Sequence, residues 1–280
     1  MLTYKNFFDL KNHKFQELFD NTEYVWQGLL NIKNFLKNKL EPNISQFLLK
    51  ANKKENSLVL SQTIVIYNND IYTDNFEILE TDATKEKLLV KIDDKIINTA
   101  TVIYEGAIFL DDEIYIGNGT LIEPGALIKG PTYIGNNTEV RQGAYVRGNV
   151  IIGDKCVVGH TTEIKSSVML GESKAGHFAY IGDSILGKVN LGAGTKLANL
   201  KLDNSIVKIK IEDTNYDTGL KKFGAILGDG VETGCNSVTT PGTLLSKNVF
   251  VYPNTTVRGY HKPDTIIKQD GKTYQLNLKK

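Results

Sequence analysis

The chain has 280 residues, of which 41% are hydrophobic and 23% are charged, and its formal net charge at pH 7 is +1. These are ordinary globular values with ample core material, and the near-zero net charge excludes a bulk attraction to nucleic acid or anionic lipid. The N-terminal residues lack a basic segment followed by an apolar run, and no apolar stretch approaches the length of a membrane span. We therefore expect a soluble, cytoplasmic protein without a nucleic-acid or membrane partner.

Residues 1–100 are predicted to form a small α+β domain, to which the sequence assigns no chemistry. Hydrophobic residues recur at helical spacing between residues 21 and 40. They are Val25, Leu29, Ile32 and Leu36. Asp20 or Asn21 is expected to cap this helix, because short polar side chains accept hydrogen bonds from the free N–H groups of a first turn.

Two β-rich stretches follow the predicted helix, at residues 57–67 and 87–97. The first ends in Asn68-Asn69-Asp70. This run favours a turn, because asparagine tolerates a left-handed backbone and its side chain can bond to nearby backbone.

A six-residue repeat begins at Leu110 and determines the predicted fold. The aliphatic series is Leu110, Ile116, Ile122, Ile128, Ile134, Val140, Val146, Ile152, Val158, Ile164 and Leu170. Four residues after nine of these positions stand Thr120, Ala126, Thr132, Thr138, Ala144, Val150, Cys156, Thr162 and Val168.

An α-helix cannot keep this repeat on one face, because six residues advance it by about one and two-thirds turns. In a triangular solenoid each hexad supplies one short strand and one corner, and parallel strands of successive coils stack about 4.8 Å apart. The aliphatic residue then fills the core, and the small residue packs near the corner. The sequence therefore predicts a mainly β protein with a parallel β-helix over residues 101–258.

The repeat falters after Gly171 and breaks again over residues 203–224. Loops leave a solenoid at such breaks. The polar run at residues 212–217 predicts a protruding loop or hairpin within this insertion. Residues 259–280, which include several lysines, are expected to form a C-terminal tail.

Positions eighteen residues apart lie above one another in such a solenoid, so Lys129, Arg147 and Lys165 are predicted to stack on one outward face. Like charges about 5 Å apart repel, so this ladder either extends into solvent or binds an anion such as a phosphate. On spacing alone a solvated surface is the commoner outcome, and a nearby histidine favours the anion site.

His177 is the candidate catalytic base. The eighteen-residue rule places it in one column with Arg141 and Gly159. A neutral imidazole near pH 7 accepts a proton from an attacking amine, whereas most histidines in such a setting only bond to a corner carbonyl. His160 raises the alternative of a zinc site, but a third suitably spaced ligand is missing, so no metal is predicted. Cys156 and Cys235 have no paired metal-ligand spacing and are expected to be reduced thiols.

Residues 173–183 read SKAGHFAYIGD, followed by SILGKVNLGAGTKLANLK. They meet in full a family motif of Ser-Lys, two small residues, His, two further residues, Tyr, an aliphatic residue, Gly and Asp. Over residues 138–258 the chain resembles the hexapeptide-repeat acyltransferases, in particular the acetyltransferase domain of bacterial bifunctional UDP-N-acetylglucosamine pyrophosphorylase/glucosamine-1-phosphate acetyltransferases. The resemblance implies a left-handed β-helix, an acetyl-CoA co-substrate and a homotrimer with CoA between neighbouring subunits.

The same resemblance implies residue roles. His177 looks like the general base that takes a proton from the acceptor amine. The residues that would contact a sugar phosphate or nucleotide sugar are Arg147, Lys165, Tyr180, Asn190, Asn199 and Lys222. Contacts with acetyl-CoA fall to Ala193, Cys235 and Pro253, and backbone N–H groups near Ala193 would hold the developing oxyanion.

The chain also departs from the family. The family has an Asn-Tyr pair where this chain has Asn199 followed by Leu200, which removes a polar contact and leaves the acceptor open. A serine expected at the CoA site is Cys235, which keeps the size but weakens hydrogen bonding. Residues 1–100 contain no glycine-rich, arginine-containing phosphate loop, so nucleotidyl transfer is not expected.

The leading hypothesis is an acetyl-CoA-dependent N-acetyltransferase. Its acceptor would be an amino-sugar phosphate such as glucosamine 1-phosphate, or a nucleotide amino-sugar, in nucleotide-sugar and cell-envelope precursor synthesis. The alternative is a non-catalytic trimeric module that binds sugar phosphates or regulates another protein. Leu200 favours that alternative, and a base at His177 among cations argues against it. A sugar-1-phosphate nucleotidyltransferase comes third, and a separate enzyme of that kind would be a partner.

Overall fold

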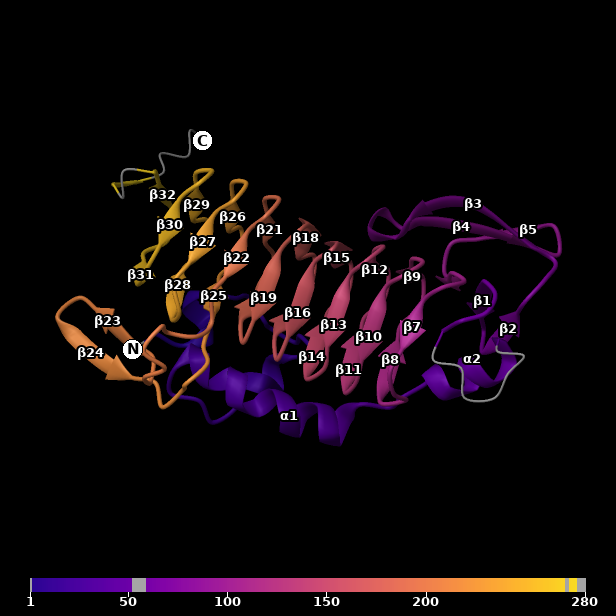
Figure 1. Ribbon diagram of the computed structural model, residues 1–280, viewed down its shortest axis with the longest axis horizontal. Coiled ribbons are helices and arrows are strands. Elements are labelled where there is room, and N and C mark those ends of the chain that lie inside the picture. The colour runs from indigo at the N-terminus through magenta and orange to yellow at the C-terminus, as the bar shows by residue number, and fades with distance from the viewer. Residues whose placement is uncertain (1, 52–58, 270–271, 276–280) are drawn as a thin grey trace.

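The structure is a computed structural model that describes residues 2–51, 59–269 and 272–275. Its main body is a parallel β-helix, in which the chain passes through three sheets in turn (Figure 1). Two of these sheets contain eight strands each within the described residues, which gives eight three-strand coils. The predicted mainly β fold with a parallel β-helix is confirmed.

We number the three sheets as faces, in the order in which the chain visits them. Face 1 contains β6 (Thr101–Ile103), β9 (Leu121–Ile122), β12 (Glu139–Val140), β15 (Val157–His160), β18 (Lys174–His177), β21 (Asn190–Leu191), β26 (Glu232–Thr233), β29 (Phe250–Val251) and β32 (Thr265–Ile267). Face 2 contains β7 (Ile108–Phe109), β10 (Leu127–Lys129), β13 (Tyr145–Arg147), β16 (Glu163–Lys165), β19 (Tyr180–Gly182), β22 (Lys196–Leu197), β27 (Val238–Thr239) and β30 (Thr256–Val257). Face 3 contains β8 (Ile114–Ile116), β11 (Thr132–Ile134), β14 (Val150–Ile152), β17 (Val168–Met169), β20 (Ile185–Leu186), β25 (Ala225–Leu227), β28 (Thr243–Leu245) and β31 (Tyr260–His261).

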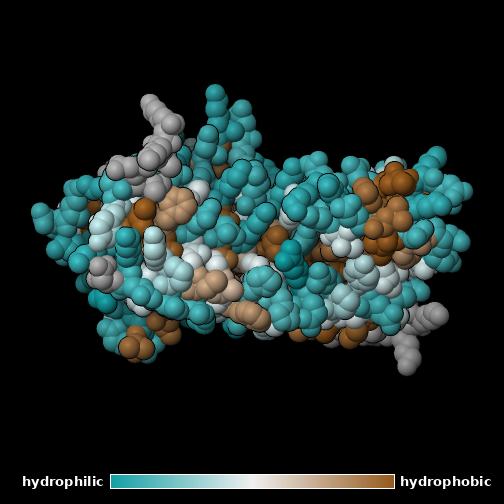
Figure 2. Space-filling model, turned by 90° about the horizontal axis from the view of Figure 1, so that it is seen from above, coloured by the Kyte–Doolittle hydropathy of each residue, from teal (hydrophilic) through white to brown (hydrophobic). Residues whose placement is uncertain are grey.

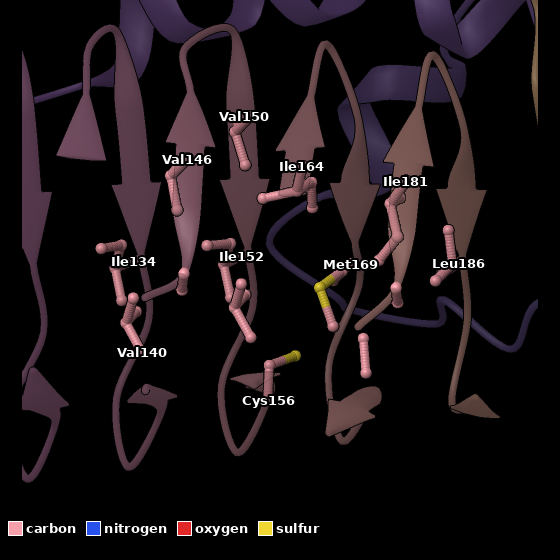
Figure 3. Close-up of a cluster of buried hydrophobic side chains, with 14 of the residues drawn as sticks. Ile134, Val140, Val146, Val150, Ile152, Cys156, Ile164, Met169, Ile181 and Leu186 are labelled. Carbon is pink, nitrogen blue, oxygen red and sulfur yellow. The ribbon is translucent and has the colours of Figure 1, made fainter. Parts of the chain in front are cut away.

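The aliphatic repeat fills the space between the three faces. The side chains from Ile134 to Ile164 point inward between the strands, as Figure 3 shows for Ile134, Val140, Val146, Ile152 and Ile164. Each of these five residues is fully buried. Burying one such side chain contributes about 1.5–3 kcal/mol, so the repeat is the main source of stability for the coils.

At both ends of the series the inward position differs by one residue from the prediction. Phe109 fills the core in the first coil, and Leu110 is 38% exposed. Met169 pairs with Ile152, while Leu170 packs outward in a different hydrophobic cluster. The cause is corner length, because the first coil is one residue longer than eighteen and the coil after Ile152 is one residue shorter.

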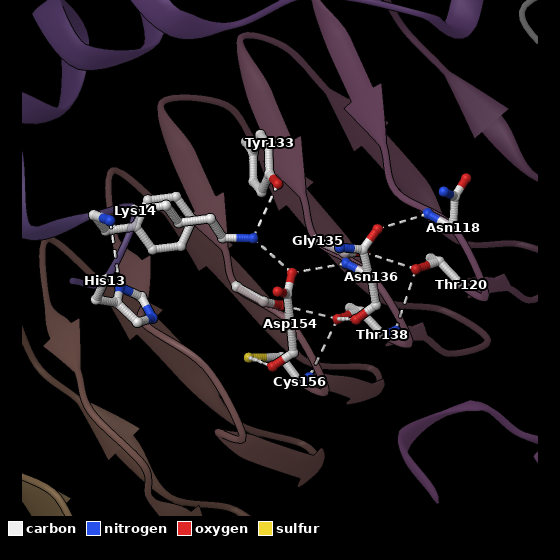
Figure 4. A network of polar contacts seen from close by, with 12 residues as sticks. His13, Lys14, Asn118, Thr120, Tyr133, Gly135, Asn136, Thr138, Asp154 and Cys156 are labelled. Atoms are coloured by element: carbon white, nitrogen blue, oxygen red, sulfur yellow. Dashed lines mark hydrogen bonds and ion pairs between the residues drawn. The ribbon is translucent and has the colours of Figure 1, made fainter. Parts of the chain in front are cut away.

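Buried hydroxyl groups connect successive coils at the corner between face 3 and face 1 (Figure 4). The Thr120 hydroxyl donates to the carbonyl of Gly135 (2.7 Å) and accepts from the N–H of Thr138 (3.2 Å). The Thr138 hydroxyl donates to Gly153 (2.8 Å) and accepts from the N–H of Cys156 (3.2 Å). This ladder satisfies backbone groups that would otherwise be buried without partners.

Residues 2–40 cover face 3. They form η1 (Tyr4–Asn6), η2 (Gln16–Phe19), η3 (Val25–Gln27) and α1 (Gly28–Lys39), and α1 lies along the lower side of the coils in Figure 1. Their apolar side chains share one cluster with the outward residues of face 3. The cluster includes Phe7, Phe8, Phe15, Trp26, Ile32 and Leu36 with Ile151, Val168, Ile185, Ile226 and Leu244.

The helix predicted between residues 21 and 40 is present, but its predicted cap is wrong. The chain first makes the 3-10 turn η3, in which the Gln27 Oε1 atom accepts the N–H of Tyr24 (2.9 Å). Asp20 and Asn21 lie before this turn and outside the helix.

The rest of the N-terminal part closes the first coil and covers part of face 1. The elements are α2 (Ile44–Ala51), β1 (Ile64–Tyr67), β2 (Asp70–Tyr72), β3 (Phe76–Asp82), η4 (Ala83–Lys85), β4 (Lys87–Ile92) and β5 (Lys95–Ile97). β1 pairs antiparallel with β6, and Asn68 and Asn69 form a left-handed turn as predicted, with φ of +49° and +67°. A domain boundary at residue 100 stays a prediction.

An insertion leaves the β-helix after β22, and the chain re-enters the β-helix at β25. Leu200 and Lys222 pair at its base, and β23 (Lys208–Ile211) and β24 (Thr214–Asp217) form a hairpin within it. The ring of Tyr216 lies 5.4 Å from Tyr24 and 6.1 Å from Trp26. β20 still pairs directly with β25, so the stack of coils is unbroken.

The coils continue past residue 258, where the sequence predicts a tail, and β33 (Thr273–Gln275) pairs antiparallel with β32. Seen from above, the surface is mostly hydrophilic and its hydrophobic side chains form separate patches (Figure 2). No helix in the described part of the chain has the length and apolar character needed to cross a membrane.

Candidate functional site

The corner between face 1 and face 2 carries His177. β15 and β18 pair in parallel, and their register places His160 next to His177 in successive coils. The predicted column of Arg141, Gly159 and His177 is therefore wrong. The short corner before Val168 reduces the repeat to seventeen residues, which moves His177 by one position.

The residues assigned to acetyl-CoA lie along the same corner, in the coils that follow His177. The N–H of Gly194 donates to the carbonyl of His177 (3.0 Å), and the N–H of Asn236 donates to the carbonyl of Ala193 (2.8 Å). The pattern continues with Asn254 and the carbonyl of Cys235 (2.9 Å). We call this line of residues the corner column. It contains Gln142, His160, His177, Ala193, Cys235 and Pro253.

His177 is exposed at the end of β18. Its ring centroid lies 6.2 Å from that of Phe178, and within the described residues neither of its ring nitrogens has a hydrogen-bond partner. His160 differs, because its Nδ1 atom lies 3.0 Å from the carbonyl oxygen of Gln142. In His177 both ring nitrogens are free to exchange a proton with a ligand, whereas in His160 only Nε2 is.

The predicted ladder of cations lies on face 2. Lys129 and Arg147 pair in register, and Lys165 follows Arg147 one coil later. Each of the last two has a carboxylate partner that the sequence reasoning missed. The Arg147 Nη1 atom lies 2.6 Å from Glu163 Oε1, and Lys165 Nζ lies 2.9 Å from Asp183 Oδ2. Since Glu163 and Asp183 are sixteen and eighteen residues further along the chain, only the coil register reveals these pairs.

Asp183 joins two of the predicted substrate residues. Its Oδ2 atom accepts hydrogen bonds from Lys165 Nζ (2.9 Å) and from Asn199 Nδ2 (2.5 Å). Tyr180 lies beside this group, near the side-chain amide of Asn199. Burial, together with the nearby carboxylates of Glu163 and Asp183, raises the pKa of Tyr180, so the phenol stays protonated and able to donate at neutral pH.

Gly182 is required at the centre of this group. A Cβ atom at this position would lie 2.6 Å from the Tyr180 hydroxyl oxygen and 2.7 Å from Asn199 Nδ2. Any side chain would therefore separate Tyr180 from Asn199. The glycine of the motif allows these two polar side chains to meet over the strand.

The structure brings Arg147, Lys165, Tyr180 and Asn199 together along face 2, the face that follows the corner column in the chain. Lys222 is exposed at the base of the insertion, opposite Leu200. Asn190 lies on face 1, in register with Lys174 and Glu232. It lines a groove of about 470 Å³ that is separate from the face 2 group.

The possible metal ligands do not gather at this site. Within residues 2–51, 59–269 and 272–275, no group of three or more His, Cys, Asp or Glu side chains is arranged to hold a metal ion. The groups that could take part in chemistry are the imidazole of His177, the cationic groups of Lys129, Arg147 and Lys165, and the backbone N–H groups of the corner turns. These groups suit proton transfer and anion binding.

The six-residue repeat, the three-faced coil, a histidine at one corner and the paired cations of face 2 define a hexapeptide-repeat β-helix protein with polar groups along one side. The chain belongs to the family described as GMPPB C-terminal domain, whose model matches residues 128–267.

Similar curated proteins include a bifunctional sugar-1-phosphate nucleotidylyltransferase/acetyltransferase of Sulfurisphaera tokodaii, 38% identical over 86 residues, which are 30% of this chain and 21% of the relative. The bifunctional protein GlmU of Methanococcus aeolicus is 36% identical over 105 residues, 34% of this chain and 25% of the relative. The chain thus spans a quarter or less of the length of these relatives. The resemblance to the acetyltransferase part of such bifunctional proteins is confirmed.

Solved structures with similar folds include an N-acyltransferase, AntD, from Bacillus cereus in complex with dTDP-4-amino-4,6-dideoxyglucose and coenzyme A. It shows 15% identity and a TM-score of 0.28 over 62% of this chain and 84% of that one. The UDP-N-acetylglucosamine acyltransferase of Francisella novicida shows 16% identity and a TM-score of 0.30 over 62% and 67%. Values this low support no statement about ligands.

Proposed function

We propose that the protein is an acetyl-CoA-dependent N-acetyltransferase whose acceptor is an amino-sugar phosphate, such as glucosamine 1-phosphate, or a nucleotide amino-sugar. The observation that carries the proposal is the corner column. A free histidine, His177, is followed along one edge by the residues assigned to acetyl-CoA, and the cations Arg147 and Lys165 lie on face 2, which the chain enters after this edge. Acetyl donor and anionic acceptor would meet at His177.

In the proposed reaction the acceptor amine attacks the thioester carbonyl of acetyl-CoA. His177 takes a proton from the amine as the C–N bond forms, and the tetrahedral intermediate expels the CoA thiolate, which receives a proton in turn. The N–H of Gly194 already donates to the carbonyl of His177, which leaves the N–H of Ala193 as the donor for the oxyanion in this turn.

The face 2 group would hold the acceptor. Lys165 has three N–H donors, of which Asp183 takes one, so the others remain for a phosphate. Tyr180 and Asn199 supply neutral polar contacts beside it. The same pairing with Asp183 keeps the lysine in one position before the ligand arrives.

A homotrimer is part of the proposal. Asn190 and Tyr180 lie on different faces of the same chain, so both can contact one acceptor only if Asn190 comes from a neighbouring copy. The large apolar side chains of Leu200 (40% exposed) and Leu202 (104% exposed) on the insertion are available to such a neighbour. Size-exclusion chromatography with light scattering should give three chains per particle, and a monomer would contradict a shared site.

A non-catalytic sugar-phosphate-binding or regulatory module is the second candidate. It is favoured by the carboxylate partners of Arg147 and Lys165, which already neutralise both cations. The exposed Leu200, where the family has tyrosine, supports it too. We do not propose nucleotidyl transfer by this chain, and a separate nucleotidyltransferase would act with it in nucleotide-sugar synthesis.

The test is thiol release from acetyl-CoA, followed with Ellman's reagent against a panel led by glucosamine 1-phosphate. Release that depends on an amino sugar and falls by about 10²–10⁴-fold in His177→Ala supports the transferase and its base. His160→Asn, one coil earlier on the same corner, should retain most of the activity. If no compound in the panel causes thiol release and calorimetry detects no CoA binding, the non-catalytic binding module is favoured.

A further inference from the structure

The position directly after the corner column, and the equivalent position one coil before the column begins, have a left-handed backbone. Seven successive coils place there Gly125, Gly143, Thr161, Phe178, Gly194, Asn236 and Asn254, with φ between +49° and +76°. Glycine adopts this conformation freely and asparagine tolerates it, whereas a bulky side chain is strained by it. Phe178, with φ of +54°, is the bulkiest residue of the series.

The fold does not need this aromatic ring. Phe178 is 54% exposed, so it adds little to the core. Its ring contacts are with two histidines of the corner column: 5.4 Å and edge-on to His160, and 6.2 Å and tilted to His177. Phe178 also occupies one of the two positions that the family motif leaves open. A strained, exposed aromatic beside the candidate base is the kind of feature that a functional site retains against its cost in stability.

The direction of the ring indicates which ligand it meets. It lies closer to His160 than to His177, and therefore leans toward the coils that carry Arg147 and Lys165. Ala193 and the other residues assigned to acetyl-CoA lie in the coils on the opposite side of His177. The ring thus lies on the side of His177 that faces the coils of Arg147 and Lys165, away from the residues assigned to acetyl-CoA.

We propose that Phe178 is an acceptor-binding residue, whose ring packs against the apolar face of the amino-sugar pyranose and presents its amine to His177. The inference rests on the proposed function and adds a specificity residue to it. A pyranose exposes a patch of C–H groups on one face, and these groups do not form strong hydrogen bonds. An aromatic ring provides a flat apolar surface against which that patch can pack. Binding energy of this kind orients the acceptor, because the cations of face 2 fix only its phosphate end.

Phe178→Asn separates the two roles of the position, because asparagine is the residue that the same series carries in two later coils. We expect the melting temperature to rise by about 2 °C or more as the strain is relieved. We expect KM for glucosamine 1-phosphate to rise about tenfold, with KM for acetyl-CoA unchanged within about twofold. A structural role for the ring predicts the opposite, a lower melting temperature with unchanged kinetics.

Thr161→Asn is the matched control, since Thr161 is strained at the same position one coil earlier, with φ of +49°. It should raise the melting temperature without a change in either KM. Phe178→Leu, which keeps apolar bulk, should lie between the wild type and Phe178→Asn in acceptor KM. An unchanged acceptor KM in Phe178→Asn, or an increase confined to acetyl-CoA, overturns the proposal.

Saturation-transfer NMR with glucosamine 1-phosphate distinguishes this inference from the proposed function. Transfer from the aromatic protons to the sugar ring in the wild type, and its loss in Phe178→Asn, would support the contact even if no acetyl transfer occurred. Transfer that persists in Phe178→Asn, or no binding of the sugar phosphate at all, would refute it.

Discussion

The ammonium group of Lys165 lies 2.9 Å from the carboxylate of Asp183, and each of the two side chains is only 16% exposed. A charge this far from water depends on its partner, because desolvation is not recovered when the partner is removed. Asp183 also accepts a hydrogen bond from Asn199, so one carboxylate holds two predicted substrate residues.

Asp183→Ala should destabilise the protein by about 2 kcal/mol in urea denaturation, because Lys165 and Asn199 both lose their acceptor. Glu17→Ala is a suitable control, since the Glu17 side chain is 54% exposed and its carboxylate lies 3.0 Å from Lys39 Nζ. The control should change stability by less than about 0.5 kcal/mol. Equal stability of both variants would mean that Asp183 holds neither residue.

The two thiols should differ in reactivity. Burial raises the pKa of Cys156 to about 12, whereas Cys235 is exposed on the corner column. Thiolate is the reactive form, so Ellman's reagent at pH 8 should titrate Cys235 in the native protein and both cysteines after denaturation. Rapid reaction of both in the folded state would show that the corner around Cys156 opens. Cys235→Ala would remove this background from the acetyltransfer assay.

Stability should fall when the pH drops below the ordinary histidine value of 6.5. Burial lowers the pKa of His13, and it also lowers that of His261. With a lowered pKa in the folded state, the unfolded chain binds more protons, so stability rises with pH between the folded pKa and 6.5 and is complete above 6.5. Urea midpoints measured between pH 5 and pH 7.5 should show this slope. A smaller slope is expected in His13→Asn, and an unchanged slope there would assign the effect to other groups.

Tyr216 should hold the insertion to the N-terminal segment. Its ring packs edge-on against the stacked rings of Tyr24 and Trp26, which lie 4.6 Å apart. Tyr216→Ala removes these contacts, and limited proteolysis should then cut between residues 200 and 222 faster than in the wild type. Tyr145→Ala, on face 2 outside this cluster, should leave the cleavage rate unchanged. Equal rates in both variants would place the anchor of the insertion elsewhere.

The sequence predicted the coils well, because a period of six fits one backbone arrangement and the aliphatic side chains must all be buried. It predicted the columns poorly wherever a corner gains or loses a residue. One shortened corner explains two of the differences. Met169, and not Leu170, fills the core, and His177 lies next to His160 and not next to Gly159. Corner length leaves no clear signal in the hydrophobic pattern.

The polar pairs of the site could not be predicted from the sequence either, because the two members of each pair are far apart in the chain. Arg147 and Lys165 suggested a ladder of unpaired cations, yet Glu163 and Asp183 come from the next coil and neutralise them. Likewise, the helical pattern predicted α1, but the rule for caps could not anticipate the turn at η3, in which Gln27 takes the place of Asp20 or Asn21.

The pairing of β20 with β25 across the insertion has an evolutionary consequence. β25 stacks on β20 of the preceding coil as if the residues inserted between β22 and β25 were absent, and the entropic cost of closing a loop grows only slowly with its length. Segments of different size and chemistry can therefore be exchanged at this junction without refolding the scaffold. Because the junction begins directly after Asn199, such exchanges offer a route by which descendants of one β-helix acquire different acceptors.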